Sequence, residues 1–111
     1  MPLLTKQKNN GDDSKVLQAI DKVLRKIFGD EATLLIYKYL ENRYSLRQDE
    51  IAEKIDVFAE GLEEFLRSGA HIIEMKILED VYSSYGLESE LELEGSRYDF
   101  VSQMRMLALK A

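Results

Sequence analysis

Two side chains that could do chemistry lie within the apolar arc of one predicted helix in this sequence. His71 and Glu74 are three residues apart in the run from Gly69 to Gly86, so on a helix their side chains can meet. A carboxylate among apolar neighbours loses solvation, which raises its pKa, and perturbed acids of this kind gather in active sites. A His and a Glu at this spacing can also supply two ligands to a metal ion in a helical carboxylate site. His71 and Glu74 are therefore the candidate metal or acid site.

The alternative is a purely structural role for this pair. Metal sites of that kind need further carboxylates from facing helices, and Glu63, Glu64 or Asp80 could supply them, but no second His-x-x-Glu pair occurs. A buried Glu74 can instead pair with an arginine or accept a hydrogen bond from a tyrosine. We favour this structural role, and we assign no catalytic, cofactor-binding or metal-binding residue from the sequence. The sequence also lacks GxxxxGK[ST], GxGxxG, GxSxG and HExxH, so it offers no motif for an enzyme.

The stretch that carries the pair is predicted to be the central helix of the protein. At helical pitch its apolar residues fall on one broad arc that other elements must cover. These residues are Ala70, Ile73, Met75, Ile77, Leu78, Val81, Tyr82 and Tyr85. Gly86 is a suitable left-handed stop for this helix.

Two helices are predicted before the central one. A first amphipathic helix starts near Ser14 and ends at Gly29, and Asp30 can cap the next. The body of that second helix, ATLLIYKYL, is apolar nearly all round, although a buried strand is a competing interpretation of LLIYKYL. A helix without a polar face is buried on several sides, and a chain this small has few elements to cover it.

The apolar second helix is the reason to expect self-association. We predict that its surplus apolar side chains form the interface of a homodimer, with Leu34, Tyr37 and Tyr39 as the interface residues.

The rest of the chain completes an all-α fold. A Ser45/Gln48 capping box opens a short helix, LRQDEIAEKI, and an amphipathic helix with Phe58 and Leu62 on one face follows it. A closing helix begins after a second box at Ser96, and residues 87–95 are predicted to be loop or frayed helix, with a strand as the alternative. We expect a disordered tail over residues 1–13 and a single domain over residues 14–111, folded as a compact orthogonal bundle of about five to six helices.

Composition and charge narrow the classes of function. The chain has 111 residues, no cysteine and a formal charge of −6, and it shows neither a membrane-spanning run nor a secretory signal, so we expect a cytoplasmic protein. The middle of the chain is acidic, whereas residues 14–28 and 96–111 are net basic, which predicts that the basic ends pack near the acidic middle. Because most of this surface repels a polyanion, binding to nucleic acid is disfavoured, and no membrane contact is expected.

Two parts of the sequence resemble known kinds of protein. Residues 44–70, from YSLRQDEIAEKI to EEFLRSGA, resemble the helix-turn-helix of winged-helix regulators. This resemblance implies a DNA-binding regulator, but the would-be recognition helix presents Glu60, Glu63 and Glu64 with only Arg67, whereas reading DNA needs Arg and Lys. Over residues 16–86, the runs FGDEATLLIYKYLENRYSL and EGLEEFLRSGAHIIEMKILEDVY resemble short uncharacterised helical proteins of archaeal genomes. That resemblance implies a compact helical fold and an intracellular setting, and no activity.

The sequence therefore predicts a non-enzymatic protein-interaction or regulatory module that binds a protein partner, itself, or both. The alternative is a helix-turn-helix regulator, and a metal or acid site at His71 and Glu74 comes third.

Overall fold

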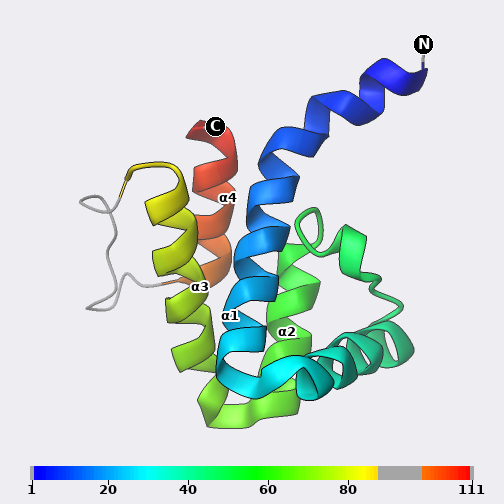
Figure 1. Ribbon diagram of the computed structural model, residues 1–111, viewed down its shortest axis with the longest axis vertical. Coiled ribbons are helices and arrows are strands. Elements are labelled where there is room, and N and C mark those ends of the chain that lie inside the picture. Colours follow the sequence, from blue (N-terminus) through cyan, green and yellow to red (C-terminus); the bar gives the residue numbers. More distant parts are fainter. Residues whose placement is uncertain (1, 88–98, 111) are drawn as a thin grey trace.

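The computed structural model describes the backbone of residues 2–87 and 99–110 and the side chains of residues 14–87 and 99–107. Within these residues every regular element is helical, which confirms the predicted all-α class. The elements are the α-helices α1 (Pro2–Tyr44), α2 (Ile55–Leu66), α3 (Ala70–Ser84) and α4 (Phe100–Lys110) and the short 3-10 helices η1 (Gln48–Glu50) and η2 (Arg67–Gly69) (Figure 1).

Helix α1 is divided by a sharp bend at Gly29. The backbone there has φ 88° and ψ 171°, a left-handed conformation that residues with a Cβ rarely adopt. Beyond the bend, the Thr33 hydroxyl donates a hydrogen bond of 2.7 Å to the Gly29 carbonyl. Thr33 is buried, so this bond satisfies its polar group. The predicted break between the first two helices is therefore real, although the two run on as one element. We call residues 14–28 the first part of α1 and residues 30–44 its second part.

Side chains on both sides of the bend hold the two parts of α1 together. The Arg25 guanidinium pairs with Asp21 in the first part and with Asp30 in the second, each at 2.9 Å. The Tyr37 hydroxyl donates a hydrogen bond of 2.8 Å to the same Asp21 carboxylate. Burial, followed by this hydrogen bond to an anion, raises the pKa of Tyr37, so its phenol stays protonated and remains a donor.

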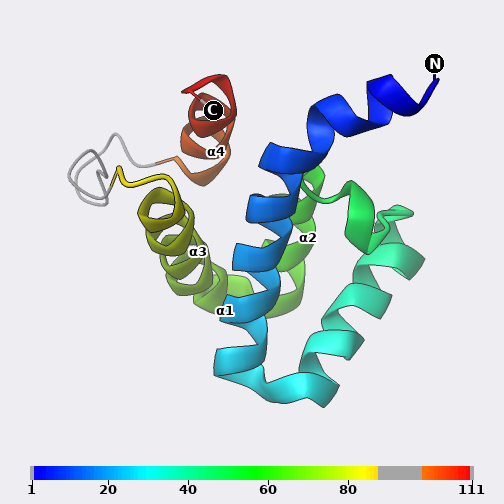
Figure 2. The same ribbon diagram turned by 45° about the horizontal axis from the view of Figure 1, so that its top comes forward.

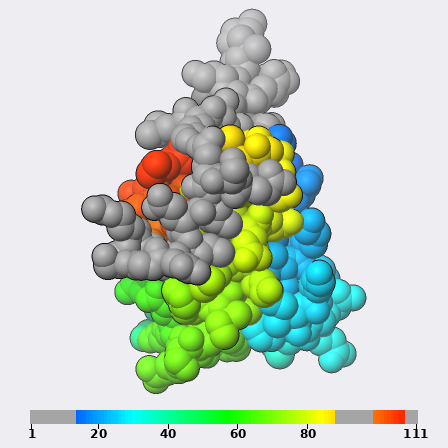
Figure 3. Space-filling model, turned by 90° about the vertical axis from the view of Figure 1, so that its left-hand side faces the viewer, coloured from blue at the N-terminus to red at the C-terminus, as the bar shows by residue number. Residues whose placement is uncertain are grey.

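The core lies between both parts of α1 and the helices α2, α3 and α4. Figures 1 and 2 show the first part of α1 beside α2 and α3, with the second part leaving this group at the bend. On the face seen in Figure 3, α3 forms the surface between α1 and α4. The fully buried side chains come from all four α-helices and from the connection around η1, and they include Leu24, Ile36, Leu46, Phe58, Ile77 and Leu107.

Helix α4 closes the core by packing on α2 and α3. The rings of Phe58 and Phe100 lie 6.4 Å apart, and the buried Tyr82 hydroxyl donates a hydrogen bond of 2.9 Å to the side-chain oxygen of Gln103. These contacts combine apolar burial with a satisfied polar pair, which fixes α4 against α3.

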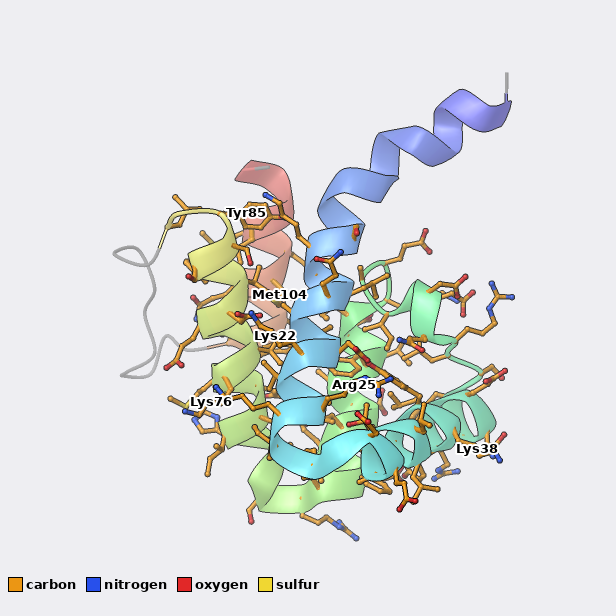
Figure 4. The ribbon with its side chains drawn as sticks, in the orientation of Figure 1. Lys22, Arg25, Lys38, Lys76, Tyr85 and Met104 are labelled. Carbon is orange, nitrogen blue, oxygen red and sulfur yellow. The ribbon has the colours of Figure 1, made fainter. Side chains whose placement is uncertain are left out.

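Ion pairs between elements follow the predicted charge pattern. Lys22 on α1 contacts Asp80 on α3 at 2.9 Å, and Arg105 on α4 contacts Asp56 on α2 at 3.4 Å. Figure 4 shows Lys22 lying between α1 and α3. Each of these two contacts joins a basic residue near one end of the chain to an acidic residue between the ends.

The prediction of five to six helices is too high. The described residues contain four α-helices, and the predicted short helix over LRQDEIAEKI is only the 3-10 helix η1 followed by turns. Ser45 has φ 54°, and the Glu50 carboxylate accepts a hydrogen bond from the Arg47 amide at 3.0 Å, so the local cap forms here and not at Ser45. Leu46 and Ile51 are both 1% exposed, and burying both ends of this short segment favours a tight connection over a regular helix.

The end of α3 agrees with the prediction at Gly86. This glycine has φ 71°, its amide bonds to the Ser83 carbonyl at 3.0 Å, and the Leu87 amide bonds to the Tyr82 carbonyl at 2.8 Å. That pair of bonds is a Schellman motif, in which the left-handed residue ends the helix. The interpretations of residues 87–95 and of the Ser96 cap fall mainly on residues 88–98, which lie outside the described residues.

The structure describes only the backbone over most of the first thirteen residues. A disordered tail is predicted for residues 1–13, whereas the described backbone is helical from Pro2 onward. The division into a tail and a single domain over residues 14–111 stays a prediction.

Helix α2 passes close to the second part of α1 at Gly61. A Cβ at this position would overlap Leu40 Cδ2 and lie 3.0 Å from Tyr44 Cε2. Leu40 is 1% exposed, so its side chain has little room to move aside. The approach of these two helices therefore depends on the missing side chain at Gly61.

Replacing Gly61 by alanine should lower the free energy of unfolding by about 1–2 kcal/mol, because overpacking outweighs the roughly 1 kcal/mol that alanine gains over glycine in a helix. Urea denaturation measures this. Gly69→Ala is the matched control, since Gly69 has φ −71° and its nearest neighbour, Leu66 Cβ, lies at 4.0 Å. That variant should keep or slightly raise the stability. Equal effects of the two substitutions would contradict the close approach at Gly61.

Candidate functional site

The structure places His71 and Glu74 in different environments, although both lie on α3. Glu74 is 4% exposed and belongs to the buried face of the helix, whereas His71 is exposed to solvent. The spacing of three residues put both on one predicted arc, but the core covers only the Glu74 side of that arc. The two residues therefore do not form a shared buried site.

Glu74 meets a carboxyl group of another helix. Its side chain is hydrogen-bonded to Glu63 of α2, and Asp99, which precedes α4, adds a second nearby negative charge. Burial, then the hydrogen bond to Glu63 and the charges of Glu63 and Asp99, raise the pKa of Glu74 to about 8. Glu74 is the buried member of the pair, so we assign the shared proton to it. Near pH 7 the carboxyl group of Glu74 is therefore mostly protonated.

One oxygen of this buried carboxyl group is unsatisfied. Glu74 Oε2 has no hydrogen-bond partner in the part of the chain that the structure describes. An unpaired buried polar atom costs free energy, and protonation of the carboxyl group reduces that cost because it removes the charge. Chemically, this site can hold and release one proton between α2 and α3.

The other carboxylates proposed as metal ligands are engaged elsewhere. Glu64 contacts Arg43 and two tyrosines, and Asp80 pairs with Lys22. Among the residues that the structure describes, no group of three or more His, Asp and Glu side chains is arranged to hold a metal ion. The geometry thus gives the metal hypothesis only the pair Glu63 and Glu74.

Glu64 is the centre of a cluster that was not predicted from the sequence. Its carboxylate accepts hydrogen bonds from the hydroxyls of Tyr39 and Tyr44, each at 2.6 Å, and from the Arg43 guanidinium at 3.1 and 3.2 Å. These bonds hold the pKa of Glu64 at about 2, and the adjacent anion raises the pKa of Tyr44 to about 12. The cluster fastens the second part of α1 to α2. In the sequence, this cluster is indicated by Tyr39 and Arg43, which are four residues apart and therefore lie on the same face of a helix.

The predicted interface residues are placed in three different ways. Leu34 is 55% exposed and Tyr39 is half-buried. Tyr37 is buried, and its hydroxyl is hydrogen-bonded to Asp21. Tyr37 therefore contributes to the bend and not to the surface. Leu35 is 62% exposed, although it was not among the predicted interface residues.

The exposed leucines lie near an aromatic contact between the second part of α1 and α2. Leu35 lies one turn before Tyr39, and the ring of Tyr39 lies 4.8 Å from that of Phe65 on α2, which is 42% exposed. We call Leu34, Leu35, Tyr39 and Phe65 the outer strip. It runs along the second part of α1 and ends on α2.

The segment that resembles a helix-turn-helix has only its second helix. The predicted first helix is η1 and a set of turns, and α2 follows directly from them. On α2 the exposed side chains include Glu60 and Glu63, which would face the phosphates of DNA with negative charge.

Comparison with protein-family models, with curated proteins and with solved structures finds no match for this chain. Of the helices that the structure describes, none combines the length and the apolar character needed to cross a membrane. Any function must therefore be inferred from the surface and the buried groups of the chain itself.

Replacing Glu74 by glutamine should change how stability depends on pH. The pKa of Glu74 is about 8 in the folded chain and about 4.5 in the unfolded chain. Its contribution to stability is therefore fully present below about pH 4.5 and is lost as the pH rises through about 8. Relative to Glu74→Gln, the parent should lose about 2–4 kcal/mol between about pH 5 and pH 9 in urea denaturation.

The control for this prediction is Glu79→Gln, an exposed position on the same helix. It should keep the pH dependence of the parent. A constant difference between parent and Glu74→Gln at every pH would contradict the raised pKa of Glu74.

Replacing Glu64 by glutamine should have the opposite pH dependence. The pKa of Glu64 is lowered from about 4.5 to about 2, so its contribution is present above about pH 4.5 and is lost as the pH falls through about 2. Glu64→Gln should therefore lower the midpoint of thermal unfolding at pH 7, and the difference from the parent should shrink in acid. Glu60→Gln, at an exposed position one turn earlier, serves as the control. A deficit that persists at about pH 2 would count against the charged cluster.

Proposed function

We propose that this chain is a non-enzymatic interaction module that associates with a second copy of itself through the outer strip. The observation that supports this is the exposure of Leu34 and Leu35, which are 55% and 62% exposed on a helix whose opposite face is fully buried. Two adjacent leucines with more than half of their surface in water cost free energy that a partner can recover.

The arrangement of the elements also supports this proposal. The second part of α1 lies at the edge of the molecule, away from α3 and α4, so a second copy can approach it without displacing the core (Figure 1). The Glu64 cluster and the bend at Gly29 hold this helix in place, which lowers the entropy lost when it binds.

The association should be weak. The strip consists of four partly exposed side chains. A dimer formed through them alone would bury less surface area than stable dimers bury. We therefore expect a dimer that forms as the protein concentration rises and dissociates on dilution. A cytoplasmic location and the kinship with short archaeal helical proteins remain predictions beside this proposal.

Replacing both Leu34 and Leu35 by serine should abolish self-association, because the variant loses the apolar area at the centre of the strip without gaining charge. Size-exclusion chromatography with light scattering over a hundredfold range of concentration measures this. The parent should rise from the mass of one chain toward that of two, and the double variant should stay at one.

The matched control replaces two equally exposed apolar residues elsewhere. Ile72 on α3 is 59% exposed and Met106 on α4 is 52% exposed, and serine at both positions should leave the association of the parent unchanged. A parent that keeps the mass of one chain over the whole range would overturn the proposed function.

A further inference from the structure

Two charged side chains flank the exposed leucines symmetrically. Glu31 precedes Leu34 by three residues and Lys38 follows Leu35 by three, so both lie at the same distance from the midpoint between the leucines. At a rise of 1.5 Å per residue this distance is about 5 Å along the helix axis.

The four residues share one face of the helix. At about 100° per residue, the positions 31, 34, 35 and 38 fall within an arc of about 100°. This arc lies opposite the buried Thr33, Ile36 and Leu40, which are at most 1% exposed. Figure 4 shows Lys38 on the second part of α1, far from α3.

Both charges are available to a partner. Glu31 and Lys38 are exposed, and neither has an ion pair or a hydrogen bond from its side chain within the part of the chain that the structure describes. By contrast, nearby charged side chains on the same helix, such as Asp30 and Arg43, have partners inside the chain.

We infer that two copies of this chain pair through the second part of α1 in antiparallel orientation, with Glu31 of each copy facing Lys38 of the other. This inference rests on the proposed function and specifies its geometry. A two-fold axis between Leu34 and Leu35 sets Leu34 of one copy against Leu35 of its partner, and the same axis brings the opposite charges together twice. Helices pack 8–10 Å apart, a distance that glutamate and lysine side chains can bridge at the edge of a contact.

A parallel or shifted pairing would not use these charges. In a parallel pair Glu31 would lie beside Glu31 and Lys38 beside Lys38, so like charges would repel. In an antiparallel pair with another register, Leu34 could not lie against Leu35 of the partner copy while Glu31 faces Lys38. The symmetric spacing thus selects one orientation and one register.

Single charge reversals test this arrangement. Glu31→Lys and Lys38→Glu shift the formal charge of −6 by two in opposite directions. If net charge alone governed association, one would strengthen the dimer and the other would weaken it. In the antiparallel pairing both place like charges together twice, so each should weaken self-association by about tenfold, as measured by sedimentation equilibrium.

Restoration of the pairs is the decisive measurement. The double variant Glu31→Lys/Lys38→Glu should associate as the parent does. A mixture of the two single variants should form heterodimers about tenfold tighter than either variant alone, because every pair then joins opposite charges. The folding control is the midpoint of thermal unfolding of each variant, since Glu31 also lies in the first turn of a helical segment, where a negative charge is favourable.

The matched controls are Glu79→Lys and Lys76→Glu, which make the same changes of charge at exposed positions on α3 (Figure 4). They should leave self-association within about twofold of the parent. If the leucine variant dissociates but the charge reversals do not restore one another, the antiparallel register is wrong and the outer strip remains the interface. If the parent itself never associates, both the register and the proposed function fall.

Discussion

The bend at Gly29 is the constraint on which the rest of the structure depends. A straight α1 would carry Leu34 and Tyr39 away from α2, and the Glu64 cluster could not form. The left-handed backbone at Gly29 turns the helix, the buried Thr33 hydroxyl donates a hydrogen bond to the Gly29 carbonyl, and Asp21 accepts hydrogen bonds from residues on both sides of the bend. The same bend moves the second part of α1 to the edge of the molecule. A single backbone conformation therefore determines both the core and the exposed strip.

The parts of the fold that could be predicted are those that depend on local chemistry. Gly29 and Gly86 mark helix ends because only glycine readily takes a left-handed backbone, and the periodicity of α3 places Ile77 and Val81 in the core. The segment LRQDEIAEKI was predicted wrongly because a capping motif and a helical period say nothing about how short a connection must be. Its apolar side chains Leu46 and Ile51 are buried in the core. Tertiary packing therefore prevails over the local preference for a helix.

The candidate site could be predicted only in part, for a related reason. The sequence places both His71 and Glu74 within an apolar arc, but only Glu74 is buried, because the core covers only its side of that arc. It does not show that Glu63 faces Glu74, because the pairing of residues on two helices depends on the register in which they pack. Similarly, Tyr37 and Tyr39 are only two residues apart, yet one bonds to Asp21 in the core and the other to Glu64 near the surface. The direction of each ring follows from the bend and not from its apolar character.

The two perturbed acids show how the protein divides its charges. Glu64 is surrounded by donors and keeps its charge, so it can fasten two helices where water still reaches the cluster. Glu74 is surrounded by apolar groups and carboxyls, so it holds a proton and behaves as a neutral side chain near pH 7. The carboxylate of Glu64 is occupied by hydrogen bonds, and the carboxyl group of Glu74 is buried. The chemistry that remains accessible in the outer strip and beside it is the apolar area of Leu34 and Leu35 and the exposed charges of Glu31 and Lys38 next to them.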